Sequence, residues 1–146
     1  MAKTYRLGAA RRAANSVMAL VIRLGAGPKS SHLLTTTGRR SGEPRTTPVT
    51  LVDRDGVRWL VAPYGDVGWV HNVHADNTVS LKRGGHTSKY SAIGVPSEIA
   101  GPVLQQYVRE VPITASFFDA SADDPASDFV AEATRHPVFR LTTPIS

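Results

Sequence analysis

A short loop between two strand-like segments carries the side chains that an anion-binding site needs. Residues 33–37 and 45–52 are rich in strand-favouring residues, and Gly38 and Gly42 bracket the loop between them. The donors in and beside this loop are Arg39, Arg40, Ser41, Arg45, Thr46 and Thr47. Guanidinium groups bind phosphate and carboxylate through paired hydrogen bonds, and glycine lets backbone N–H groups approach a ligand. The loop is therefore a candidate anion site, although a solvated basic turn has the same composition.

A second segment could form the wall of a pocket for a planar ring. Pro63-Tyr64-Gly65 follows a strand-like run, and glycine at a strand end lets the backbone lie against a ring and donate hydrogen bonds to it. The aromatic residues available to a ring pocket are Tyr64, Trp69, Tyr90, Phe117 and Phe118. Aromatic side chains belong to the core more often than to a ligand site, so the glycine-containing segment is the more specific signal.

Three other chemistries have little support. His71 and His74 would share one face of a helix, but the sequence has no cysteine and no well-spaced third metal ligand. We expect His71 to border the pocket and His74 to lie at the surface. Ser41 precedes a strand and not a helix, so it lacks the context of a hydrolase nucleophile. The acidic residues between 119 and 128 fit a solvated loop better than a catalytic carboxylate pair.

The whole chain has a formal net charge of +5, and the positive charge is concentrated in its first part. Eight of the 17 basic residues precede the first acidic residue, Glu43. The remainder holds nine basic and 12 acidic residues, so the basic field is confined to the N-terminal part and the first hairpin loop. Such asymmetry attracts an anionic partner: a phosphorylated cofactor, a lipid surface or nucleic acid.

The elements that must position these residues are mostly hairpins. Strands are predicted over residues 33–37, 45–52, 57–62, 78–82, 87–95 and 138–142, and helices over 67–76, 97–111 and from Asp124-Pro125 to His136-Pro137. Asp124 is expected to cap the last helix, with Pro125 at its first position. Clustered hairpins favour an antiparallel sheet or barrel over a βαβ fold. At 146 residues the chain fits one domain.

The N-terminal segment has a different character from the rest. Val17, Leu20, Val21 and Leu24 have helical spacing after a basic start, which predicts a basic amphipathic helix over residues 9–24. Residues 1–28 would carry this helix, and residues 29–146 would form the ligand-binding domain. The helix could pack on the domain or touch an anionic membrane, and its apolar run is too short to span a bilayer.

Three segments of the chain resemble one enzyme family. Residues 34–45 (LTTTGRRSGEPR), 61–65 (VAPYG) and 69–73 (WVHNV) are similar to the deazaflavin-dependent nitroreductases, which are actinobacterial oxidoreductases that use coenzyme F420. The likeness continues through residues 75–79 and 82–85, and the TTTGRRSG string and the later Trp-X-X-Asn are specific as a pair. The resemblance implies an α+β fold: a single-domain, mainly antiparallel split β-barrel of the flavin-reductase type with peripheral helices.

The resemblance also implies a function and a site. Reduced F420 would give a hydride to an electron-poor organic acceptor such as an activated alkene, a quinone or a nitro compound. The matching segments assign cofactor binding to Arg39, Arg40, Ser41, Gly42, Arg45, Thr47, Ala62, Pro63, Tyr64, Gly65, Trp69 and Asn72. The proton that follows the hydride has three candidate sources: Tyr64, Tyr107 and solvent. Relatives have tyrosines where this chain has Phe117 and Phe118, so a donor at those positions is absent.

Two alternatives share these features. An FMN-binding reductase with the same barrel would also need basic residues for a phosphate. A membrane-associated protein that binds an anionic or lipidic ligand would explain the basic N-terminal helix. Nucleic-acid binding is disfavoured because the basic residues are not interleaved with exposed aromatic residues. The sequence predicts a cytoplasmic protein, with or without membrane association, that is a monomer or homodimer.

Overall fold

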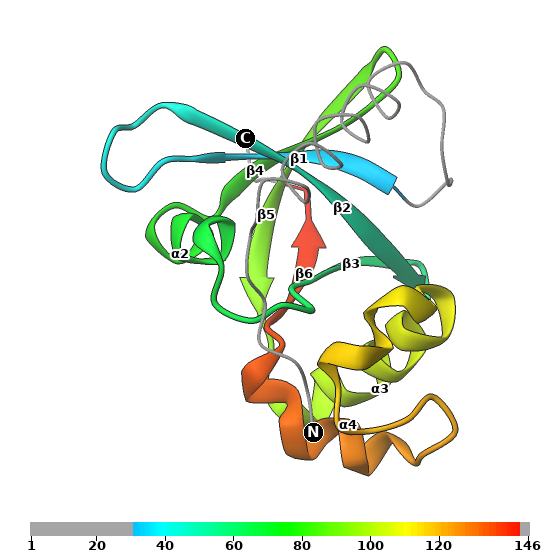
Figure 1. The fold of residues 1–146 in the computed structure, drawn as a ribbon. Helices are drawn as coiled ribbons and strands as arrows, with labels where there is room; N and C mark the ends of the chain where they lie inside the picture. The colour runs from blue at the N-terminus through cyan, green and yellow to red at the C-terminus, as the bar shows by residue number, and fades with distance from the viewer. Residues whose placement is uncertain (1–30, 144–146) are drawn as a thin grey trace.

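The computed structural model describes residues 31–143, so the predicted N-terminal helix lies outside the described residues. Within this range six strands form a closed barrel in the order β1-β2-β3-β6-β5-β4, with every neighbouring pair antiparallel (Figure 1). The strands are β1 (Ser31–Thr37), β2 (Pro44–Arg54), β3 (Val57–Val61), β4 (Thr78–Arg83), β5 (His86–Gly94) and β6 (Val138–Thr142). The predicted α+β class with a mainly antiparallel barrel is confirmed.

Two helical insertions interrupt the run of hairpins. The first is α2 (Gly68–Ala75), which connects β3 to β4. The second connects β5 to β6 and consists of α3 (Ser97–Glu110), η1 (Pro112–Phe117), α4 (Ala126–Glu132) and η2 (Ala133–Arg135). Figure 1 shows α3 and α4 side by side at one end of the barrel and α2 apart from them. No helix in the described range is long and apolar enough to cross a membrane.

The β2–β3 hairpin follows directly from its turn residues. Asp55 and Gly56 have positive φ values of 54° and 76°, and Arg54 pairs with Val57 across the turn. A two-residue turn with positive φ at both positions matches the right-handed twist of the strands, and Asp-Gly adopts it readily. The predicted tight turn is therefore confirmed.

Successive side chains of a strand point to opposite faces of the sheet, and this alternation divides the core into two layers. On β3, Leu60 faces the barrel interior, whereas Trp59 and Val61 face the α3–α4 side. The interior layer contains Leu34, Leu51, Leu60, Ala62, Val70, Val73, Val79, Leu81, Ala92, Phe139 and Leu141. The second layer joins the sheet to α3 and α4, and it fixes where the end of α3 lies relative to β2 and β3.

The predicted start of α4 is wrong in detail. Pro125 is the residue that precedes the helix, which begins at Ala126, and no side chain caps it. The carboxylate of Asp124 instead accepts a hydrogen bond from the Ser121 N–H at 2.8 Å, while the Asp124 N–H donates to the Ser121 carbonyl at 2.9 Å. Because the carboxylate closes this preceding turn, it is not available as a helix cap.

Candidate functional site

A cavity of about 940 Å³ brings most of the predicted site residues together. It lies between the β1–β2 hairpin, the start of α2 and the stretch from the end of α3 into η1. Predicted binding residues that line it are Arg39, Arg40, Ser41, Arg45, Thr47, Pro63, Tyr64, Trp69 and Asn72, and Tyr107 lines it as well. Segments far apart in sequence, including the loop after β1 and the end of α3, therefore share one concave surface.

Three predicted site residues do not line the cavity. Ala62 is 1% exposed and belongs to the barrel interior. Gly42 has a φ of +72°, which fits the β1–β2 turn, and Gly65 has a φ of +87°. The Gly65 N–H donates to the Ala62 carbonyl at 3.3 Å, so this glycine shapes the turn and its N–H is not free for a ring. His71, expected at the border of the pocket, is exposed and is not among its lining residues.

Arg39 is part of the scaffold of the loop. Its guanidinium donates to Oδ1 of Asn72 at 2.9 Å and to the Gly68 carbonyl at 3.3 Å, and its backbone N–H also donates to Asn72 Oδ1 at 3.2 Å. Asn72 is 5% exposed, and its Nδ2 donates to Oγ1 of Thr36 at 3.1 Å. Asn72 thus connects α2, β1 and the basic loop through one side chain.

Replacing Asn72 with Ala should lower the free energy of unfolding by about 1–2 kcal/mol, because the buried Thr36 hydroxyl and the partly buried Arg39 N–H lose their hydrogen bonds. Chemical denaturation would measure the change. The matched control is Asn77→Ala, since Asn77 is exposed in the same region. Equal stability of the two variants would contradict the scaffold role of Asn72.

Arg40 and Arg45 are the cations that remain available to a ligand. Both line the cavity and both are exposed. Within the described residues no acidic side chain forms an ion pair with either one. Gly38 keeps this corner compact, because a β-carbon there would lie 2.9 Å from Ser41 Oγ and 3.0 Å from the Glu43 carbonyl oxygen. The chemistry of these side chains suits an anionic ligand.

Other residues that line the cavity are aromatic. Tyr64 packs edge-on against Phe117, with ring centroids 4.7 Å apart. Trp69 is half-buried and packs on the barrel interior layer. Tyr107 is buried at 4% exposure, and this burial, with a smaller contribution from Tyr64, raises the pKa of its hydroxyl well above the ordinary 10.0. Tyr107 therefore lines the cavity as a neutral side chain.

The raised pKa of Tyr107 makes the fold sensitive to alkaline pH. Above pH 10.0 the unfolded tyrosine loses its proton while the folded one keeps it, so stability falls as the pH rises. We expect Tyr107→Phe to lose less stability than the parent between about pH 9 and pH 11. Denaturation curves at both pH values would measure this difference. An identical loss in the two proteins would mean that Tyr107 does not carry the effect.

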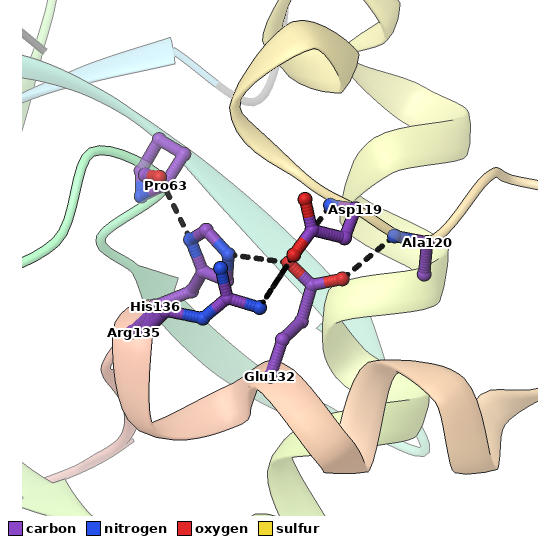
Figure 2. Close-up of polar contacts among 6 residues, drawn as sticks. All are labelled: Pro63, Asp119, Ala120, Glu132, Arg135 and His136. Carbon is purple, nitrogen blue, oxygen red and sulfur yellow. Dashed lines mark hydrogen bonds and ion pairs between the residues drawn. The ribbon is translucent and has the colours of Figure 1, made fainter. Parts of the chain in front are cut away.

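Some of the site was not predicted. Val111, Ile113 and Thr114 line the cavity from η1 and the residue before it, a 3-10 segment without a clear periodic pattern. Glu132 and His136 form a buried pair beside the Pro63 segment (Figure 2). Their spacing of four residues is a signal that both side chains share a helix face. In residues 31–143 no group of three or more His, Cys, Asp or Glu side chains could hold a metal.

Comparisons with known proteins agree with this geometry. A family model described as F420H2-dependent quinone reductase matches residues 4–120. A solved F420-H2 dependent reductase is similar at 27% identity with a TM-score of 0.55, covering 78% of this chain and 95% of its own. Another structure, titled as a domain-swapped dimer, is 21% identical with a TM-score of 0.57 over 91% of this chain and 96% of its own. A FAD-binding protein from Mesorhizobium loti shares the fold at 12% identity and a TM-score of 0.51, over 89% and 90%.

Proposed function

The chain belongs to the F420H2-dependent quinone reductase family, and we propose that it passes a hydride from reduced F420 to an electron-poor acceptor: a quinone, an activated alkene or a nitro compound. It is an F420H2-dependent reductase, and its cofactor is coenzyme F420. The choice of acceptor and the roles of individual residues are the parts that we propose.

The cavity fits this cofactor in both size and chemistry. Its volume of about 940 Å³ is near the upper end of small-molecule sites, as a long cofactor with a neighbouring acceptor requires. The observation that carries the proposal is the lining of this one cavity, which combines the available Arg40 and Arg45 with the aromatic side chains of Trp69 and Tyr64. An anionic tail and a planar ring joined in one molecule match these two kinds of side chain.

In this proposal the residues of the chain bind the cofactor and orient its ring. Arg40 and Arg45 hold the anionic tail, and each charge-assisted contact contributes about 1.5–3 kcal/mol. Ser41 and Thr47 add neutral donors beside them. Pro63 and Tyr64 support the ring. The scaffold of Asn72 and Arg39 keeps the basic loop fixed against α2, the helix that carries Trp69.

Tyr107 positions the acceptor and does not give up its proton. Because burial raises its pKa, forming the phenolate in this cavity is unfavourable. Its neutral hydroxyl donates a hydrogen bond to an acceptor oxygen, and the proton for the product comes from Tyr64 or solvent. Tyr107→Phe should therefore raise KM for a quinone by about two- to tenfold, as expected for one neutral hydrogen bond.

Steady-state oxidation of reduced F420 tests the proposed acceptor. A quinone, an enone and a nitroaromatic compound should each be compared with the rate in the absence of protein. We expect at least one class to be reduced well above that background by the parent, and less efficiently by Tyr107→Phe. Binding of F420 without acceleration for any class would contradict the proposed acceptor.

Peripheral membrane contact through residues 1–28 is a separate proposal, compatible with a cytoplasmic monomer or homodimer. Six basic residues and no acid precede residue 30, and each contributes about 1 kcal/mol near an anionic surface. Deleting residues 1–24 should abolish sedimentation with anionic vesicles while F420 affinity is kept. If the truncated protein aggregates, or the full-length protein ignores such vesicles, the helix packs on the barrel instead.

A further inference from the structure

Figure 2 shows a buried pair of side chains, Glu132 and His136, that joins separate segments of the chain. Nδ1 of His136 lies 2.9 Å from the carbonyl oxygen of Pro63, and Nε2 lies 2.8 Å from Oε1 of Glu132. The Glu132 carboxylate also accepts hydrogen bonds from the backbone N–H groups of Asp119 (3.1 Å) and Ala120 (2.7 Å). The exposed fractions of Glu132 and His136 are 2% and 4%, so losing any of these bonds would leave a buried polar group unpaired.

The partners of the imidazole determine where its hydrogens lie. A carbonyl oxygen can only accept, so Nδ1 of His136 carries a hydrogen and donates it to Pro63. One further hydrogen bridges Nε2 and Oε1 of Glu132, and the pair is neutral overall whichever atom holds it. Without that hydrogen, a nitrogen lone pair would face a carboxylate oxygen at 2.8 Å. Glu132 therefore fixes the ring in the orientation that holds Pro63.

The segment held by His136 is one wall of the cavity. Pro63 and Tyr64 both line it. The Ala62 N–H donates to the Pro137 carbonyl at 2.8 Å, so the backbone on either side of His136 and Pro63 is joined as well. The Pro63 carbonyl belongs to a lining residue, so the His136 bond acts directly on this wall.

The same pair also holds a second wall of the cavity, formed by η1. Through Asp119 and Ala120, Glu132 fixes the loop that follows η1, the helix that carries Ile113 and Thr114 into the cavity. Phe118 from this loop stacks on His136, with ring centroids 3.9 Å apart and an interplanar angle of 24°. The neighbouring contact of Phe117 with Tyr64 joins the two walls directly.

We propose that Glu132 and His136 are positioning residues for the reaction: they set the Pro63–Tyr64 wall against η1 and so align the bound cofactor ring with the acceptor. The inference rests on the proposed function, since it assigns both partners of the reaction to this cavity. Neither residue lines the cavity, so both act through Pro63 and the η1 loop.

Two substitutions at residue 136 separate positioning from general stability. In His136→Asn the side-chain nitrogen takes the place of Nδ1 and can still donate to Pro63, whereas in His136→Gln it takes the place of Nε2 and reaches only Glu132. Each variant loses one buried hydrogen bond, so we expect similar falls in melting temperature. His136→Gln should lower kcat by about ten- to hundredfold, because small misplacements of the reacting groups are costly, and His136→Asn should lower it far less.

Hydrogen–deuterium exchange of the ligand-free protein gives a readout that does not depend on turnover. We expect residues 62–68 to exchange faster in His136→Gln than in His136→Asn.

A second pair of variants serves if His136→Gln does not fold. The side chain of Gln in Glu132→Gln can still donate a hydrogen bond to Nε2 of His136, whereas that of Ala in Glu132→Ala cannot. Exchange of residues 62–68 should therefore be faster in Glu132→Ala than in Glu132→Gln. Equal kcat and equal exchange within each pair would overturn the positioning role. Lack of acceptor reduction by the parent would instead contradict the proposed function.

Discussion

Replacing both Arg40 and Arg45 with Ala should weaken F420 binding by about a hundredfold to ten-thousandfold. Each side chain lines the cavity and lacks an acidic partner among the described residues, so its charge is free for the anionic tail. One charge-assisted contact corresponds to about ten- to hundredfold in affinity, and the product of two such factors gives the range expected for the double variant. Fluorescence titration at low salt measures the loss, and added salt should reduce the difference.

A matched variant controls for the change in net charge. Lys89 and Arg140 are exposed on β5 and β6 and do not line this cavity. Lys89→Ala combined with Arg140→Ala removes the same two positive charges, but we expect it to reduce affinity by no more than about threefold through long-range attraction. If both double variants bind F420 alike, the basic loop is only a solvated turn.

Gly101→Ala should destabilise the fold strongly. A β-carbon at Gly101 would overlap the side chain of Val130 and lie 3.0 Å from its backbone nitrogen and 3.1 Å from the Ala126 carbonyl oxygen. Two of these neighbours belong to the backbone of α4, so α3 and α4 would have to separate. Overpacking of this kind costs about 3 kcal/mol at the upper end of its usual range, which exceeds the gain in helix propensity of about 1 kcal/mol.

Thermal unfolding checks this prediction, with Gly85→Ala as the control. A β-carbon added at Gly85 would meet nothing within 4 Å beyond the adjacent residues, and this glycine has no positive φ, so alanine fits there. We expect Gly101→Ala to melt about 5–10 °C below the parent and Gly85→Ala to melt close to it. A small shift for Gly101→Ala would mean that α4 moves away from α3 at little cost.

The hairpins of the barrel could be predicted because their signals are local. Asp55-Gly56 specifies a tight turn, and the strand-favouring residues on both sides of it specify β2 and β3. The basic loop was predicted for the same reason, since its glycines and strand-forming flanks lie within one short segment. Most residues proposed for cofactor binding indeed line a common cavity.

Contacts between distant segments could not be predicted from local patterns. Arg39 looked equivalent to Arg40 in the sequence, but only the folded chain brings it to Asn72 on α2. Likewise, the spacing of Glu132 and His136 indicates a shared face, but nothing in it identifies the Pro63 carbonyl as the third partner. Asp124 does not cap α4 because its carboxylate closes a turn with Ser121, three residues before it in the chain.

The central claim is that this cavity binds a deazaflavin through its basic loop. Titration of the purified protein with F420 and, separately, with FMN tests it most directly, with absorbance and fluorescence as the readouts. We predict that F420 binds at least about tenfold more tightly than FMN, a difference of about 1.4 kcal/mol, and that this preference falls when Arg40 and Arg45 are replaced. Equal affinity for the two cofactors, or a preference for FMN, would contradict the claim.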